Sequence, residues 1–149
     1  MIGPKFALPS AAEEVRAYAI VLERDEEQCQ RCWRGAVVQR DHRQNRSQGG
    51  LTAPSNLHLL CPECHLWKTD HPVEAARDGW GVPGWAEPAE FPARRWLHTE
   101  LGTLRQAWVL YDDGGGWREI SAAEARRRME GGRDAEGHAV VDEVPDQLP

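Results

Sequence analysis

Two pairs of cysteines, separated by 28 residues, are the most informative chemical feature of this sequence. They are Cys29-Gln-Arg-Cys32 and Cys61-Pro-Glu-Cys64. A tight turn between paired cysteines places two thiolates on one side, so two such pairs can complete a tetrahedron of sulfur around Zn²⁺. Two disulfides, or free thiols in the core, are the alternatives. The sequence favours zinc, and because four thiolates leave no open position, we expect this zinc to be structural.

A second group of residues lies inside and beside the cysteine pairs, and its members suit a catalytic metal site: Asp41, His42, Asn56 and His65. Asp41 offers an oxygen ligand and His65 a nitrogen ligand, which leaves positions open for water and phosphate oxygens. His42 titrates near neutral pH and can take a proton from water. Asn56 can fix the imidazole or the loop through its amide.

The adjacency of Asp41 and His42 imposes a geometric condition on this site. Successive side chains of a regular β-strand point to opposite faces. Both residues can therefore serve one site only from a strand end or a distorted turn. The following Arg43-Gln44-Asn45 is compatible with such a turn.

The distribution of charge singles out the same part of the chain. The net charge is −6, yet residues 29–71 hold six basic and three acidic residues, a net +3. Local charge determines whether a surface attracts phosphate, so the acidic total does not exclude DNA. The basic residues expected to contact DNA phosphates are Arg40, Arg43, Arg46 and Lys68.

Several other polar residues are interpreted as surface groups. His58 is expected at the surface, with a phosphate contact as the alternative. His71 is expected to cap a helix or face solvent. The runs Arg94-Arg95-Trp96 and Arg126-Arg127-Arg128 are expected to be solvated faces rather than extensions of a DNA footprint.

Length and composition predict one small domain, with room for an appended subdomain. The chain has 149 residues, and no run of about 18 apolar residues that would cross a membrane. The N-terminus lacks the pattern of a signal peptide. These features predict a cytoplasmic protein, where thiols stay reduced.

Periodicity and turn residues predict an α+β fold. Ser10 and Glu13 form a capping box ahead of a helix over 11–24, on which Val15, Ala19 and Leu22 recur at helical spacing. Between and after the cysteine pairs we expect strands over 36–42 and 57–60, a loop over 43–55 and a helix over 62–70, which together form a zinc-stapled ββα unit.

The rest of the chain reads as two further segments. Residues 73–98 are rich in proline and glycine and are expected to form an irregular wrap after a short helix over 73–78. Residues 99–149 predict a hairpin, with strands over 105–111 and 117–120, then a helix over 122–130 and a strand over 138–144. Residues 1–28 form the lead-in and first helix.

The order of these residues resembles that of a known family. Cys-x2-Cys, Asp-His, a glycine-bearing loop and then Asn-Leu-x-x-Leu-Cys-x-x-Cys-His is similar to the pattern of zinc-stapled HNH endonucleases, which have the ββα-metal fold. The resemblance covers about residues 24–72 and makes 29–72 the expected nuclease core. The Arg77-Asp-Gly-Trp-Gly-Val-Pro stretch also resembles tails of phage-encoded members.

The resemblance implies roles for the matching residues. It implies that Asp41 and His65 hold the catalytic ion, that His42 is the general base and that Asn56 braces the loop. The activity implied is hydrolysis of a DNA phosphodiester with Mg²⁺, Mn²⁺ or another divalent ion. Many relatives have a second histidine one helical turn after the last, where this chain has Thr69, so the ion is expected to be held more weakly. The rival function is a non-catalytic zinc module that binds DNA or protein, and the acidic C-terminal half suits a partner such as phage packaging proteins.

Overall fold

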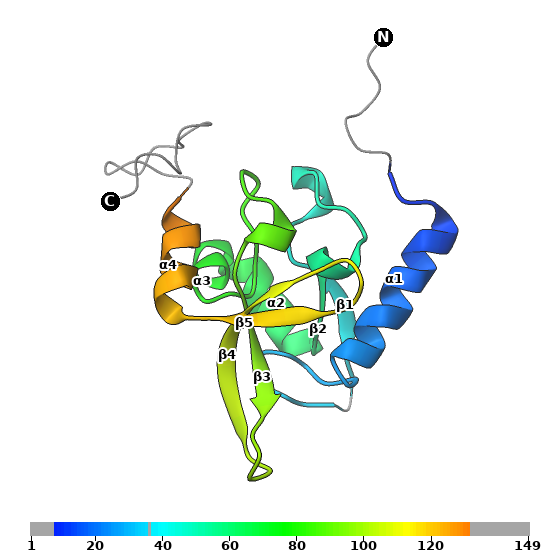
Figure 1. Ribbon diagram of the computed structural model, residues 1–149. Coiled ribbons are helices and arrows are strands. Elements are labelled where there is room, and N and C mark those ends of the chain that lie inside the picture. Colours follow the sequence, from blue (N-terminus) through cyan, green and yellow to red (C-terminus); the bar gives the residue numbers. More distant parts are fainter. Residues whose placement is uncertain (1–7, 36, 132–149) are drawn as a thin grey trace.

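A computed structural model of the chain describes residues 8–35 and 37–131, which form two small sheets and four α-helices (Figure 1). The helices are α1 (Ala11–Arg24), α2 (Pro62–Asp70), α3 (Pro72–Arg77) and α4 (Ala122–Glu130), and the strands are β1 (Gln39–His42), β2 (Leu57–Leu60), β3 (Ala93–His98), β4 (Leu104–Tyr111) and β5 (Trp117–Ile120). The mixed fold predicted from the sequence is confirmed. The strand predicted over 138–144 lies outside the described residues. None of the described helices has the length and apolar character needed to cross a membrane.

The predicted ββα unit is formed by β1, β2 and α2. The two strands pair antiparallel, with Asp41 opposite His58 and His42 opposite Leu57. Cys61 caps the first turn of α2 through its sulfur, and Pro62 occupies the first helical position, where a missing N–H costs nothing. The second cysteine pair therefore lies at the point where the strand becomes the helix.

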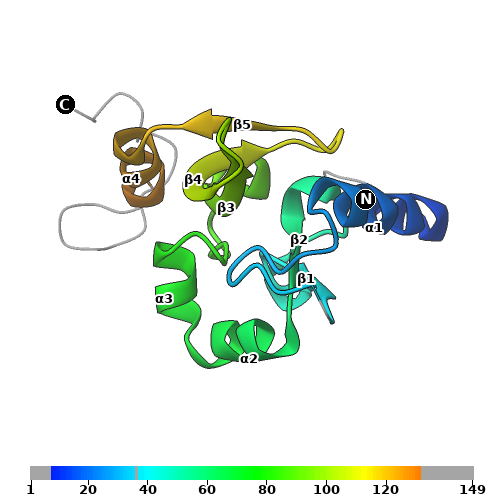
Figure 2. The same cartoon turned by 90° about the horizontal axis from the view of Figure 1, so that it is seen from below.

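Helix α1 covers the first sheet on the side opposite α2 (Figure 2). The capping box of Ser10 and Glu13 is present. The face that packs against Leu57 and Leu59 of β2 is formed by Ala17 and Val21. Of the residues at helical spacing, Leu22 packs against this cluster, whereas Val15 is 68% exposed and does not. The apolar residues of α1 lie on more than one side of the helix, and the side with Ala17 and Val21 is the one that contacts β2.

The second sheet has the order β3-β4-β5, with both pairings antiparallel. The hairpin of β4 and β5 was predicted, and Gly115 takes φ +90° in its turn, where an added Cβ would meet Ile20 of α1 at 2.5 Å. Residues 93–98, predicted to be irregular, instead form β3. Their alternating burial matches a strand, but the neighbouring prolines at 83, 88 and 92 obscured this pattern.

A buried charge network joins the two sheets. Asp25, which follows α1, is fully buried and lies 2.7 Å from Arg24 Nε and 3.3 Å from a terminal nitrogen of Arg95 on β3. The second carboxylate oxygen of Asp25 accepts the backbone N–H of Leu59 on β2 at 3.1 Å. Arg24 also stacks on Tyr111 of β4, 3.8 Å from the ring centroid. The C-terminal sheet thus shares one polar core with the ββα unit.

Arg43, directly after β1, makes a second connection between the sheets. Its guanidinium donates to four backbone carbonyls at 2.7–3.3 Å, those of Ser55, Pro88, Phe91 and Pro92. Burial lowers the pKa of Arg43 to about 10, so the side chain stays charged at neutral pH. The positive charge is compensated by carbonyl dipoles that converge from segments distant in sequence.

We therefore expect Arg43→Ala to destabilise the whole chain. The substitution leaves four buried carbonyls without this donor, and the free energy of unfolding should fall by about 3 kcal/mol or more. Chemical denaturation followed by circular dichroism measures this change. Arg40→Ala, three residues earlier and exposed, is the matched control and should change stability by less than about 0.5 kcal/mol. Equal stability of the two variants would contradict this interpretation of Arg43.

Candidate functional site

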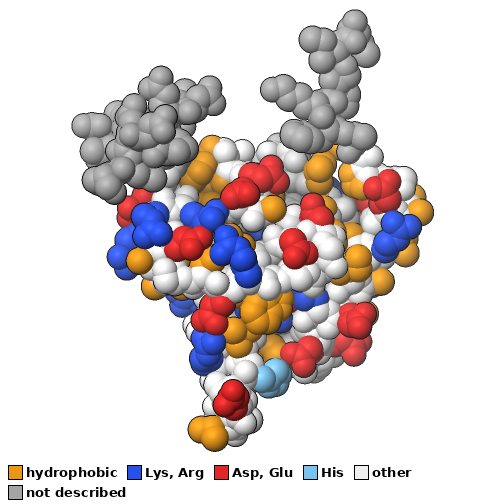
Figure 3. Space-filling model, viewed as in Figure 1, with side chains coloured by type: hydrophobic (Ala, Val, Ile, Leu, Met, Phe, Trp, Pro, Cys, Tyr) orange, Lys and Arg blue, Asp and Glu red, His pale blue; other side chains and the backbone are white. Residues whose placement is uncertain are grey.

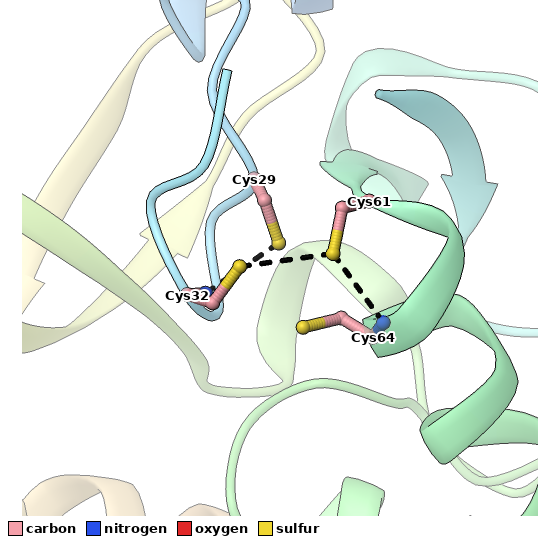
Figure 4. Close-up of side chains that lie close together, drawn as sticks. All are labelled: Cys29, Cys32, Cys61 and Cys64. Carbon is pink, nitrogen blue, oxygen red and sulfur yellow. Dashed lines mark hydrogen bonds between the residues drawn. The ribbon is translucent and has the colours of Figure 1, made fainter. Parts of the chain in front are cut away.

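The four cysteines converge as the sequence predicted (Figure 4). All four sulfur atoms lie within 4.8 Å of one another, and Cys32 Sγ is 3.7 Å from Cys61 Sγ. Tetrahedral coordination with Zn–S bonds of about 2.3 Å separates the sulfurs by about 3.8 Å. None of these described cysteines forms a disulfide. The cluster therefore fits a structural zinc ion.

The surroundings of the sulfurs also suit a bound cation. Burial raises the pKa of Cys32 and Cys64, so a proton would stay on these thiols unless a cation replaced it. Cys61 Sγ accepts the backbone N–H of Cys64 at 3.4 Å, and Arg31 approaches Cys64 Sγ at 3.4 Å. These donors compensate part of the charge that four thiolates would bring to the site.

Asp41 lies at the centre of the second predicted site. It is 4% exposed and its side chain faces α2. Its Oδ2 atom is 2.7 Å from His58 Nε2 and 3.0 Å from Lys68 Nζ. Burial raises the pKa of Asp41, but the hydrogen bond with His58 and the positive charge of Lys68 outweigh it, and the net pKa lies below its ordinary value. Asp41 is therefore a carboxylate at neutral pH.

The other oxygen of Asp41 faces His65, and this pair fits a metal ion. Asp41 Oδ1 lies 3.0 Å from His65 Nδ1, yet Nδ1 makes no hydrogen bond to any described group, although it is buried. Two ligands at adjacent corners of an octahedron with bonds of about 2.1 Å are about 3.0 Å apart. The two atoms are thus spaced as two ligands of one divalent cation would be. The imidazole ring as a whole is 45% exposed, whereas its Nδ1 atom, which faces Asp41, is buried.

His42 projects to the loop beyond β1, as the alternation of strand side chains requires. Its Nε2 lies 2.8 Å from Thr52 Oγ1 and 3.4 Å from Arg46 Nε. Arg46 Nε–H donates to Nε2, which therefore acts as an acceptor, and the Thr52 hydroxyl can donate to the same nitrogen. Burial and the charge of Arg46 lower the pKa of His42, while the charge of Asp41 opposes them. The imidazole is therefore neutral at pH 7, which a general base requires.

Asn56 holds the loop that follows His42. Its Oδ1 accepts the backbone N–H of Gln44 at 2.7 Å, and its Nδ2 donates to the carbonyls of Gln44 and Leu51 at 3.0 and 2.9 Å. Asn56 is 1% exposed. Its contacts are with the loop backbone and not with the His42 imidazole.

Lys68 links the two halves of the site. Its ammonium group contacts Asp41 and also donates to the His42 carbonyl at 2.8 Å. The predicted phosphate contact does not agree with this position, because the side chain is only 10% exposed. The same correction applies to Arg43, whose guanidinium is buried among carbonyls. The sequence gives no sign that the Lys68 side chain contacts the backbone of β1.

Arg40 and Arg46 are the two predicted phosphate contacts that remain exposed. Arg40 stacks over Tyr18 of α1, 4.9 Å from the ring centroid, and Arg46 lies 3.3 Å from the Tyr18 hydroxyl. Arg46 also approaches Glu14, at 3.8 Å. Both arginines therefore flank His42 on the side of α1.

The structure shows two contributors that were not predicted from the sequence. His58, expected at the surface, is 1% exposed and holds Asp41. The strand register could have revealed it, since residues opposite each other in an antiparallel pair have adjacent side chains. Thr52, which is 4% exposed, has no sequence signal that distinguishes it from other loop residues.

Comparison with known proteins identifies the segment that holds both sites. Residues 29–71 match the family described as HNH endonuclease. No curated protein and no solved structure gives a significant match. The resemblance stated from the sequence is therefore confirmed for the segment that contains the four cysteines, Asp41, His42, Asn56 and His65.

We expect Cys61→Ser to unfold the core. The serine removes a zinc ligand and so weakens zinc binding. In small zinc domains the free energy of zinc binding is comparable to the stability of the whole fold. Zinc content by atomic absorption and the thermal transition by circular dichroism measure the effect. Arg34→Ala, at an exposed position beside the first cysteine pair, should retain both. A zinc-free Cys61→Ser protein with native thermal stability would contradict a structural role.

We expect His65→Ala to weaken binding of a divalent ion by about ten-fold or more while zinc is retained, because one of two protein ligands is lost. Calorimetric titration of the zinc-loaded protein with Mn²⁺ measures the affinity. His71→Ala is the control, since His71 lies exposed at the junction of α2 and α3 and contacts the Trp67 carbonyl. Unchanged Mn²⁺ affinity in His65→Ala would exclude the predicted ligand.

Proposed function

From the HNH match we propose that this chain is a metal-dependent DNA endonuclease that hydrolyses a phosphodiester bond. The observation that supports this most directly is the pair of Asp41 Oδ1 and His65 Nδ1, 3.0 Å apart and not hydrogen-bonded to each other. A carboxylate and an imidazole with this geometry would hold Mg²⁺, Mn²⁺ or another divalent ion, and such an ion stabilises negative charge on a departing oxygen.

The remaining catalytic work belongs to side chains of this chain. His42 would accept a proton from the water that attacks phosphorus, and Thr52 and Arg46 would hold the imidazole in place. Lys68 contacts both Asp41 and the His42 carbonyl, so it would keep the metal ligand and the base in a fixed relation. Asn56 would maintain the loop through its backbone contacts.

Charge supports DNA as the substrate. The exposed Arg40 and Arg46 lie next to His42 and are positioned to attract a phosphate backbone. Arg43 and Lys68 are left out of this surface because their charged groups are engaged inside the fold. The cytoplasmic location, the association with phage and the packaging partners stay predictions of the sequence.

We expect the purified chain to nick supercoiled plasmid in the presence of Mg²⁺ or Mn²⁺, and EDTA to abolish the activity. His42→Ala should lower the rate by about a hundred-fold or more, the usual contribution of a positioned base, with zinc content and thermal stability unchanged. Gel electrophoresis of plasmid forms measures the rate. His98→Ala provides a control, because His98 is exposed at the end of β3.

The same assay separates the rival function from the proposed one. A protein that holds zinc, binds plasmid and cleaves none of it with any divalent ion would be a non-catalytic zinc module. Full cleavage by His42→Ala would instead leave the nuclease in place and remove His42 as its base.

A further inference from the structure

A cavity of about 1080 Å³ connects the predicted catalytic ion site to the C-terminal part of the chain. Asp41 and His65 lie at one end, and Arg126 and Met129 of α4 lie at the other. In Figure 2, α2 and α3 are on one side of this region and α4 with the second sheet is on the other. The C-terminal sheet and helix therefore form one wall of a space that reaches the site of the reaction.

The walls of the cavity combine flat rings with positive charge. Trp85 is 40% exposed and packs edge-on against Phe91, and the Arg94 guanidinium covers Trp108, 4.2 Å from its ring centroid. Arg126 adds an exposed cation to the half-buried Arg94, and Glu130 is an acidic residue on the same helix as Arg126. Basic side chains also gather over α4 in the face shown in Figure 3. Arg94 and Arg126 had been expected only to face solvent.

The size of the cavity restricts what it can receive. A volume of about 1080 Å³ corresponds to a cube roughly 10 Å on a side, about the diameter of one α-helix. A double helix, whose major groove alone is about 12 Å wide, does not enter such a space. Single-stranded nucleic acid does bind grooves of this kind, where bases stack on aromatic rings and arginine planes and cations follow the phosphates.

We propose that the cavity receives a few unpaired nucleotides of the DNA strand next to the scissile phosphate. The chain then binds DNA that has a flap or a gap more tightly than an intact duplex. The proposal rests on the nuclease function proposed above and specifies its substrate. Trp85 and Arg94 stack the unpaired bases, and Arg126 contacts a phosphate that leads away from Asp41 and His65.

Binding can be measured without cleavage by placing each substitution in the full-length His42→Ala chain. Fluorescence anisotropy in Mg²⁺ compares a nicked duplex with the same duplex that has a short thymidine flap at the nick. We expect tighter binding of the flap, by about five-fold or more, the lower limit for one base stack. Trp85→Ala and Arg126→Glu should abolish this preference.

Two control variants have the same residue types outside the cavity. Trp117→Ala removes a tryptophan that is also 40% exposed, and Arg127→Glu reverses the charge next to Arg126 on the exposed side of α4. Both should retain the preference for the flap, and all four variants should keep the parent thermal transition. The affinity for the nicked duplex should change little in Trp85→Ala.

Equal affinity for the flap and the nicked duplex would overturn the proposal, as would a preference that survives both cavity substitutions. Tighter binding of a matching RNA flap would also overturn it in favour of an RNA ligand. Plasmid cleavage by the chain with His42 intact is measured separately. Cleavage without flap preference removes only this inference, whereas a flap preference without any cleavage removes only the nuclease.

Discussion

Four sulfur ligands gathered within 4.8 Å of one another impose the constraint on which the site depends. Thiolates at this distance repel, so the arrangement is stable as a charged group only around a cation. Cys61 directly follows β2 and caps α2, and His65 lies in the first turns of that helix. A metal bound by the cysteines therefore fixes the angle at which α2 leaves the strand. This angle in turn places the His65 ring against Asp41 of the neighbouring strand.

The two carboxylate oxygens of Asp41 have different contacts. His58 and Lys68 contact Oδ2, while Oδ1 faces His65. A buried carboxylate with a single free oxygen has little freedom to rotate, so Oδ1 would already be in place if an ion bound beside His65. Lys68 contacts both Asp41 and the His42 carbonyl, so it also restricts the backbone at His42. The two halves of the candidate site are thus connected by a positive charge that is largely buried.

The local features of the fold could be predicted from the sequence, whereas long-range pairings could not. Capping residues, cysteine spacing and turn glycines predicted α1, α2, α4 and the hairpin of β4 and β5, because each of these signals acts within a few residues. Strand β3 was not predicted because the prolines that precede it indicated irregular structure, and its pairing with β4 is not visible in the sequence. Lys68 and Arg43 were assigned to phosphates because charge is visible in a sequence, whereas a carbonyl that will arrive from another segment is not.

The buried guanidinium of Arg43 also bears on how the segment that matches the HNH family relates to the rest of the protein. Three of its four carbonyl partners, Pro88, Phe91 and Pro92, come from outside the residues that match the family. The matching segment is thus continuous in sequence but is not self-sufficient in structure. If the segment were moved into another protein without residues 88–92, this buried cation would lose three of the four carbonyls that surround it.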